Sequence, residues 1–166
     1  TFLKIQDGCD AFCTYCIVPH ARGRSCSMPL ADIVDNIGKL ARAGYREVVL
    51  TGIHLGAYGH DLSPVTDLAT AMEHIQESRP IDRVRLSSIE PFEFTGKVLE
   101  QALNSDMFCR HFHIPLQSGD AEILINMGRP FSPQHFGVLI HKIHRFMPDA
   151  AIGVDALIGF PGESDS

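Results

Sequence analysis

Three cysteines near the start of the chain are the residues whose types and spacing point most directly to chemistry. Cys9, Cys13 and Cys16 stand at spacing C-x3-C-x2-C within the stretch 7–16. Thiolates are strong ligands for iron–sulfur clusters and for zinc, and such close spacing lets one loop wrap one metal centre. A four-iron cluster held by three cysteines keeps one iron free for a reacting molecule. The spacing alone also admits a structural zinc site completed by His20, or no metal at all.

Residues that flank the three cysteines favour the cluster. The string Lys4 to Cys9, the aromatic Tyr15 and the continuation Ile17 to Arg24 resemble the cluster loop of radical S-adenosylmethionine (SAM) enzymes, and within them the methylthiotransferases. This resemblance implies that the cysteines hold a [4Fe-4S] cluster whose open iron chelates SAM. It also implies that an electron from the cluster cleaves SAM to a 5′-deoxyadenosyl radical, which needs a walled pocket because water would quench or misdirect it.

The same resemblance implies SAM-binding residues beyond the cysteines. Tyr15 would lie against the adenine, and Gly52 would present backbone to the methionyl amino group, although the usual Gly-Gly-Glu is not there. Glu90 and Gln117 would contact the ribose and the methionyl group, and Arg129 would bind the carboxylate as a fork donor. The alternatives are a core aromatic for Tyr15, an ordinary turn for Gly52 and a solvated helix end for Arg129. No catalytic residue is assigned.

The histidines and the two remaining cysteines carry less information. None of the nine histidines is assigned as a metal ligand, and only His54, in the loop after the second strand, is singled out. His141 and His144 are expected at the surface of a helix. Cys26 and Cys109 admit a disulfide, but the odd total of five cysteines and their metal-like cluster favour a reducing compartment, and we expect both to be small apolar residues that are buried or half-buried.

Composition and charge limit the class of protein. The chain has 166 residues, 45% of them hydrophobic and 20% charged, which is typical of a globular domain. No apolar run of about 18 residues is present, so we expect no membrane span and a cytoplasmic protein. The net charge is −6. Because domains that bind nucleic acid by themselves are usually basic, this acidic chain is expected to bind tRNA weakly or not at all.

Hydrophobic periodicity predicts alternating strands and helices. Apolar and β-branched runs predict strands over 2–6, 47–51, 83–87, 111–115 and 151–158. Helical spacing predicts helices over 30–41, 68–75, 98–103 and 136–143, and a short one near 120–127. Such alternation predicts a parallel α/β sheet with its site at the carboxyl ends of the strands. The resemblance implies a partial (β/α)6 barrel of the radical SAM type, and we expect it to be truncated after the fifth strand.

The loop after the second strand bears on the substrate. The segment Leu50 to Gly59 resembles the methylthiotransferase branch that acts on N6-threonylcarbamoyladenosine beside the tRNA anticodon. The branches that act on isopentenyladenosine in tRNA or on a ribosomal-protein aspartate usually carry a glutamine in this loop. Both remain alternatives, as do a radical SAM reaction on a small molecule and a non-catalytic zinc-binding scaffold.

The resemblance also implies a domain organisation. Residues 1–166 would form a partial radical SAM core. An N-terminal methylthiotransferase domain with a second [4Fe-4S] cluster and a C-terminal RNA-binding TRAM domain would lie outside this chain, and an external donor would supply electrons. We therefore expect the chain to bind cluster and SAM but not to complete methylthiolation by itself.

Overall fold

The computed structural model describes residues 1–164 and contains a mainly parallel sheet backed by helices. The strands are β1 (Phe2–Asp7), β2 (Cys26–Ser27), β3 (Glu47–Gly52), β4 (Arg83–Leu86), β5 (His111–His113) and β6 (Ala151–Gly153). β1, β3 and β4 pair in parallel, and β5 pairs in parallel with β6. Single parallel bridges, Val84 to Phe108 and Ser88 to His113, join the two groups. The predicted parallel α/β architecture is therefore confirmed.

Two strands differ from the prediction. β2 was not anticipated, and it pairs antiparallel with the end of β1 through only two residue pairs, which is too short for a periodic signal. β6 ends at Gly153 rather than near residue 158. Beyond Gly153 the carbonyl of Asp155 accepts hydrogen bonds from both Leu116 and Gln117, so the regular ladder stops there and only the bridge between Gln117 and Ala156 follows.

The helices are α1 (Val18–Arg22), α2 (Leu30–Arg42), α3 (Leu68–Ser78), α4 (Gly96–Leu103), α5 (Ala121–Asn126) and α6 (Pro133–Phe146), with 3-10 turns η1 (Leu55–Ala57) and η2 (Pro91–Glu93). Four helices begin at side chains that accept a backbone N–H of the first turn: Asp67, Thr95, Asp120 and Ser132. The five predicted helices are present. α1 was missed because its five residues are too few to show a helical period.

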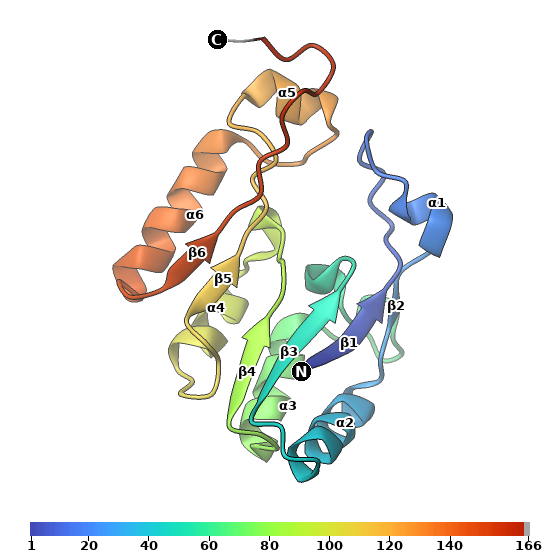
Figure 1. Ribbon diagram of the computed structural model, residues 1–166, viewed down its shortest axis with the longest axis vertical. Coiled ribbons are helices and arrows are strands. Elements are labelled where there is room, and N and C mark those ends of the chain that lie inside the picture. Colours follow the sequence, from blue (N-terminus) through green and yellow to red (C-terminus); the bar gives the residue numbers. More distant parts are fainter. Residues whose placement is uncertain (165–166) are drawn as a thin grey trace.

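The apolar faces of the helices and the strands form one core. Figure 1 shows α3 and α4 behind the strands, α2 below the start of β1, and α6 beside β5 and β6. Buried side chains of α2 and α3, such as Ile37 and Met72, join Val48 and Leu50 of β3 in this core. Within residues 1–164, no helix has the length and apolar character needed to cross a membrane.

The carboxyl ends of the strands meet at one end of the molecule. In Figure 1 the arrowheads of β1, β3, β4 and β5 point toward the end that carries α1 and α5. The cysteine loop, here defined as residues 8–17, follows β1 at that end. The loops after β3, β4 and β5 lead to the same place, as the sequence predicts for a parallel sheet.

Candidate functional site

A cavity of about 380 Å³ lies at the carboxyl end of the sheet. Seven of the eight residues that the sequence singles out for cluster and SAM line it: Cys9, Cys13, Cys16, Tyr15, Glu90, Gln117 and Arg129. The eighth, Gly52, precedes the lining residue Ile53. Phe12, Val18, Phe92 and Pro130 add apolar walls. The volume falls in the range of small-molecule sites, about 300–1,000 Å³. Residues from five separate loops thus converge on one site.

The cysteine loop is fixed at both of its ends. The N–H of Cys9 donates to the carbonyl of Gly23 at 3.1 Å, where the chain returns from α1. At the other end, Thr14 donates its N–H to the carbonyl of Met127 at 3.1 Å and its hydroxyl to the carbonyl of Asn126 at 2.8 Å. The loop therefore spans from β1 to the end of α5, and α5 helps to close the site.

Gln6 ties the cysteine loop to the loop after β3. Its side chain is buried, and its Nε2 donates to the carbonyls of Asp7 and Gly8 at 2.9 and 2.8 Å. Its Oε1 accepts the N–H of His54 at 2.8 Å. A Cβ at Gly52 would lie 2.9 Å from that same Oε1. Glycine at position 52 therefore leaves room for Gln6, a role that the sequence did not indicate.

Arg129 and Glu90 form a buried ion pair beside Cys13. Nη2 of Arg129 contacts the Glu90 carboxylate, and Nη1 donates to Sγ of Cys13 at 3.2 Å. Only 5% of the Arg129 side chain and 19% of the Glu90 side chain are exposed, so a solvated helix end is excluded. Burial raises the pKa of Glu90, while the guanidinium of Arg129 opposes that rise. Nε of Arg129 is buried and meets no hydrogen-bond partner among the described residues.

His54 stands between Glu93 and Cys9. Its Nδ1 lies 3.5 Å from Sγ of Cys9, and its Nε2 lies 2.7 Å from Oε1 of Glu93. The second contact is close enough for an ion pair, although it is not aligned as a hydrogen bond. Interaction with the Glu93 carboxylate raises the pKa of His54, and burial raises the pKa of the Cys9 thiol. The sequence singled out His54 but gave no signal for Glu93.

Tyr15 and Gln117 lie on the rim of the cavity. Tyr15 is 37% exposed and meets the ring of Phe160 edge-on, with 6.5 Å between ring centroids. It is therefore not a core aromatic, and burial of its inner part raises its pKa. Gln117 adopts φ of +66°, a left-handed conformation that side chains other than glycine and asparagine rarely take. Such backbone conformations cluster at functional sites.

The remaining histidines and cysteines lie elsewhere. His141 and His144 are exposed on α6, as predicted. His113 contacts the Ser88 hydroxyl through Nδ1 at 2.7 Å. All five cysteines are free thiols. Cys109 is half-buried, as predicted, but Cys26 is exposed, so the prediction that it is buried or half-buried is wrong. This follows from its place on β2, at the outer edge of the sheet.

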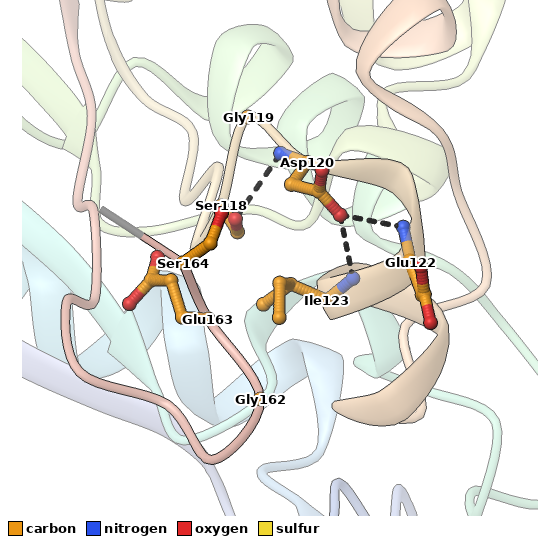
Figure 2. A pocket seen from close by; sticks show the side chains of 8 residues that line it. All are labelled: Ser118, Gly119, Asp120, Glu122, Ile123, Gly162, Glu163 and Ser164. Carbon is orange, nitrogen blue, oxygen red and sulfur yellow. Dashed lines mark hydrogen bonds between the residues drawn. The ribbon is translucent and has the colours of Figure 1, made fainter. Parts of the chain in front are cut away.

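A second hollow of about 440 Å³ lies beside the first, where the segments after β5 and β6 meet. Figure 2 shows its polar lining, which includes Ser118, Asp120 and Glu163. Asp120 caps α5 by accepting the N–H groups of Glu122 and Ile123, at 2.8 and 2.9 Å. Ser118 Oγ accepts the N–H of Asp120, and the Glu163 carboxylate accepts the N–H groups of Gly159 and Phe160, so these polar groups hold the N-terminal end of α5 and the segment 159–163.

The donor set of the first cavity fits a thiolate-bound cluster with a charged organic ligand. Three free thiols from one loop supply the ligand type of iron–sulfur clusters. The buried, unpaired Nε of Arg129 is a donor that a ligand carboxylate in the cavity would satisfy. No three His, Cys, Asp or Glu side chains within residues 1–164 are arranged to hold a single metal ion. The cavity therefore offers the ligands that the resemblance implies.

Comparison with known proteins supports the same family as the ligands in the cavity. A family model described as the Radical SAM superfamily matches residues 3–166. The chain is 39% identical to tRNA-2-methylthio-N(6)-dimethylallyladenosine synthase of Clostridium tetani over 164 residues, which are 99% of this chain and 36% of that protein. It is also 39% identical to the threonylcarbamoyladenosine tRNA methylthiotransferase MtaB of Bacillus subtilis over 163 residues, 98% of this chain and 36% of that protein. The chain thus spans a little over a third of the length of these relatives.

Solved structures share the fold. The radical SAM methyltransferase TsrM from Kitasatospora setae, solved with cobalamin and a [4Fe-4S] cluster bound, aligns with a TM-score of 0.76 at 20% identity, covering 98% of this chain and 32% of that chain. The cobalamin-dependent SAM radical enzyme OxsB aligns with a TM-score of 0.71 at 14% identity, covering 93% of this chain and 23% of that chain. These likenesses confirm the predicted type of parallel-sheet fold.

Proposed function

The chain belongs to the radical SAM superfamily, and on that premise we propose that it is the cluster-binding catalytic domain of a tRNA methylthiotransferase. The superfamily implies a [4Fe-4S] cluster and SAM. The observation that carries the proposal is the convergence of the three cysteines with Tyr15, Glu90, Gln117 and Arg129 on one cavity. The relatives with methylthiotransferase names support the reaction class.

Each proposed ligand contact has a structural basis in this chain. Cys9, Cys13 and Cys16 would hold the cluster. When bound, cluster and SAM together supply one-electron cleavage of a carbon–sulfur bond, which generates a carbon radical. Arg129 would bind the SAM carboxylate through its buried guanidinium, in place of or beside its contact with Glu90. Tyr15 at the rim would cover the adenine, and the apolar walls would exclude water from the reacting atoms.

We propose N6-threonylcarbamoyladenosine of tRNA as the substrate, because the segment Leu50 to Gly59 resembles that branch. The comparison with relatives does not distinguish the two tRNA branches, because one relative named for each adenosine substrate is 39% identical to this chain. A tRNA substrate would place the reaction in the cytoplasm. The methylthiotransferase and TRAM domains, the second cluster and the external electron donor belong to the same proposal and concern the whole protein.

Anaerobic reconstitution of the chain with iron and sulfide tests the proposed cluster. We expect about four irons per chain, a broad brown absorption band and an EPR signal that shifts when SAM is added. Cys13→Ala should lower the iron content and abolish the SAM-dependent shift, while Cys26→Ala, an exposed cysteine outside the cavity, should match the wild type. Stoichiometric zinc with no colour and no response to SAM would instead support a structural zinc domain.

The substrate needs a separate test with the whole protein. It should be expressed in cells that lack their own methylthiotransferases, and the nucleosides of the tRNA and the ribosomal proteins should both be analysed by mass spectrometry. A 2-methylthio form of N6-threonylcarbamoyladenosine is the expected product. A 2-methylthio form of isopentenyladenosine, or a modified ribosomal-protein aspartate, would assign the chain to one of the other branches.

A further inference from the structure

Two carboxylates of one short segment face the cysteine loop. Glu90, just before η2, holds Arg129, which donates to Sγ of Cys13. Glu93, the last residue of η2, holds His54, whose Nδ1 lies 3.5 Å from Sγ of Cys9. Cys13 and Cys9 are therefore each in contact with a nitrogen-bearing side chain that also contacts a carboxylate. The pair of Arg129 and Glu90 belongs to the proposed SAM site, but the pair of His54 and Glu93 has no role in that site.

We propose that His54 is a positioning residue that donates a hydrogen bond from Nδ1 to the Cys9 thiolate, and that Glu93 fixes the imidazole ring for this contact. The inference rests on the proposed function, since it requires that Cys9 binds the cluster.

The surroundings of His54 leave its ring little freedom. The side chains of His54 and Glu93 are only 15% and 12% exposed. The backbone N–H of His54 is bound by Oε1 of Gln6 at 2.8 Å, which fixes the base of the side chain. With Nε2 held 2.7 Å from the Glu93 carboxylate, Nδ1 is directed at the cysteine loop. The orientation of the ring is thus set from both ends.

The local backbone is shaped to admit Glu93. A Cβ at Gly56, in η1, would lie 2.0 Å from Oε2 of Glu93 and 2.4 Å from its carboxyl carbon. Any larger residue at position 56 would push this carboxylate away from His54. The absence of a side chain at Gly56 therefore lets the Glu93 carboxylate reach His54 and hold its imidazole ring in place.

The direction of the hydrogen bond follows from the neighbours of the ring. A thiolate that binds iron carries no proton, so the hydrogen between Nδ1 and Sγ must come from Nδ1. The Glu93 carboxylate near Nε2 is likewise an acceptor and supplies no hydrogen to the ring. Hydrogen bonds to cluster sulfurs are among the factors that set reduction potential, because they withdraw charge from sulfur and favour the reduced cluster. His54 is therefore expected to raise the potential of the cluster.

Two amide variants of His54 separate its two contacts. In His54→Asn the amide nitrogen takes the place of Nδ1 and keeps a donor toward Cys9, without reaching Glu93. In His54→Gln the amide reaches the place of Nε2 and keeps the contact with Glu93, without a donor toward Cys9. His144→Gln, at an exposed position on α6, is the matched control. Each chain is reconstituted anaerobically, its iron is counted, and its midpoint potential is measured by EPR-monitored titration.

We expect His54→Gln to lower the ratio of reduced to oxidised cluster about tenfold at a fixed ambient potential, which is about 59 mV for a one-electron couple. His54→Asn and His144→Gln should stay near the wild type. If a variant loses iron instead, loss in His54→Gln with retention in His54→Asn supports the same role. Equal potentials in His54→Gln and wild type, or equal effects of both amide variants, would overturn the inference alone. A wild-type chain that binds no four-iron cluster would overturn the proposed function and the inference together.

Discussion

Arg129 donates to Sγ of Cys13 at 3.2 Å, although 116 residues separate them in the chain. The contact joins the segment after α5 to the cysteine loop, and the hydrogen bonds of Thr14 to Asn126 and Met127 run alongside it. The proposed cluster loop and the proposed carboxylate-binding residue are therefore parts of one structural unit. A change in either is expected to alter the other.

Replacing Arg129 by methionine should destabilise the chain in a pH-dependent way. Removing one partner of a buried ion pair costs about 3–5 kcal/mol, because the other charge is left uncompensated. Burial already raises the pKa of Glu90, and loss of the guanidinium should raise it further. A raised folded-state pKa means that stability is retained below the unfolded value, near 4.3, and is lost as the pH rises through the folded value.

The loss in free energy of unfolding should therefore be largest at pH 8 and should become smaller toward pH 5, because the raised pKa of Glu90 favours its neutral form as the pH falls. Urea titrations followed by circular dichroism at the two pH values measure it. Arg145→Met, an exposed arginine on α6, serves as the control and should change stability by less than about 0.5 kcal/mol. An equal loss at both pH values would show that Glu90 does not carry the effect.

Replacing Gln6 by leucine should loosen the loop after β3. The substitution keeps a side chain of similar size but leaves the N–H of His54 and the carbonyl of Gly8 without their side-chain partner. Each unsatisfied buried group costs about 1–3 kcal/mol. We expect a total loss of about 2–4 kcal/mol and faster hydrogen exchange at the amide of His54. Gln134→Leu, at an exposed position of α6, should leave that amide unchanged, and unchanged exchange in both variants would contradict the role of Gln6.

The sequence predicted the parts of the site that depend on local pattern. The spacing of the three cysteines and the alternation of strands and helices were sufficient to place the loops after β1, β3, β4 and β5 at one end of a parallel sheet, and the structure brings residues of these four loops to one cavity. The segment after α5, which supplies Arg129, completes the cavity in place of the predicted loop around residues 159–162. The sequence did not predict α1, β2 or η2, because each has five residues or fewer and, unlike the equally short strands β4 to β6, lies in no longer apolar run.

Side-chain partners across the site could not be predicted, because they depend on the curvature of the sheet. Glu90 and Arg129 were expected to contact SAM separately, yet they contact one another. The sequence indicated only that Gln6 follows the predicted strand pattern, because no neighbouring residue predicts that its side chain bonds to the cysteine loop. Glu93 gave no signal because it lies in a 3-10 turn, and its partner His54 is 39 residues away.

Replacing Gly8 by alanine should disrupt the start of the cysteine loop. Gly8 has φ of +67°, and a Cβ there would lie 2.0 Å from the carbonyl oxygen of Arg24, a backbone atom that cannot turn aside. Left-handed strain alone costs about 1–2 kcal/mol, and the clash adds to it. We expect a stability loss above about 2 kcal/mol together with lower iron content after reconstitution.

Gly137→Ala, in α6 with open space around it, is the control and should instead stabilise the chain by about 0.5–1 kcal/mol. Normal iron content in Gly8→Ala would show that the loop tolerates the shift.

Tyr58 should make the stability of the chain sensitive to alkaline pH. Its side chain is fully buried, its hydroxyl donates to the carbonyl of Met28 at 2.7 Å, and burial raises its pKa to about 12. In the unfolded chain the value is about 10, so the folded state binds this proton more tightly. The stabilisation is complete below pH 10 and is lost as the pH rises toward 12, by on the order of 2–3 kcal/mol.

Tyr58→Phe should lose about 1–2 kcal/mol at pH 8, because the Met28 carbonyl loses its partner, and should show a flatter decline between pH 10 and 12. Tyr45→Phe, at a tyrosine before β3 that is 48% exposed, is the matched control. Chemical denaturation at a series of pH values, compared between the two variants, measures the difference. A wild-type decline that Tyr58→Phe reproduces in full would assign the alkaline sensitivity to other groups, the lysines and the free cysteines among them.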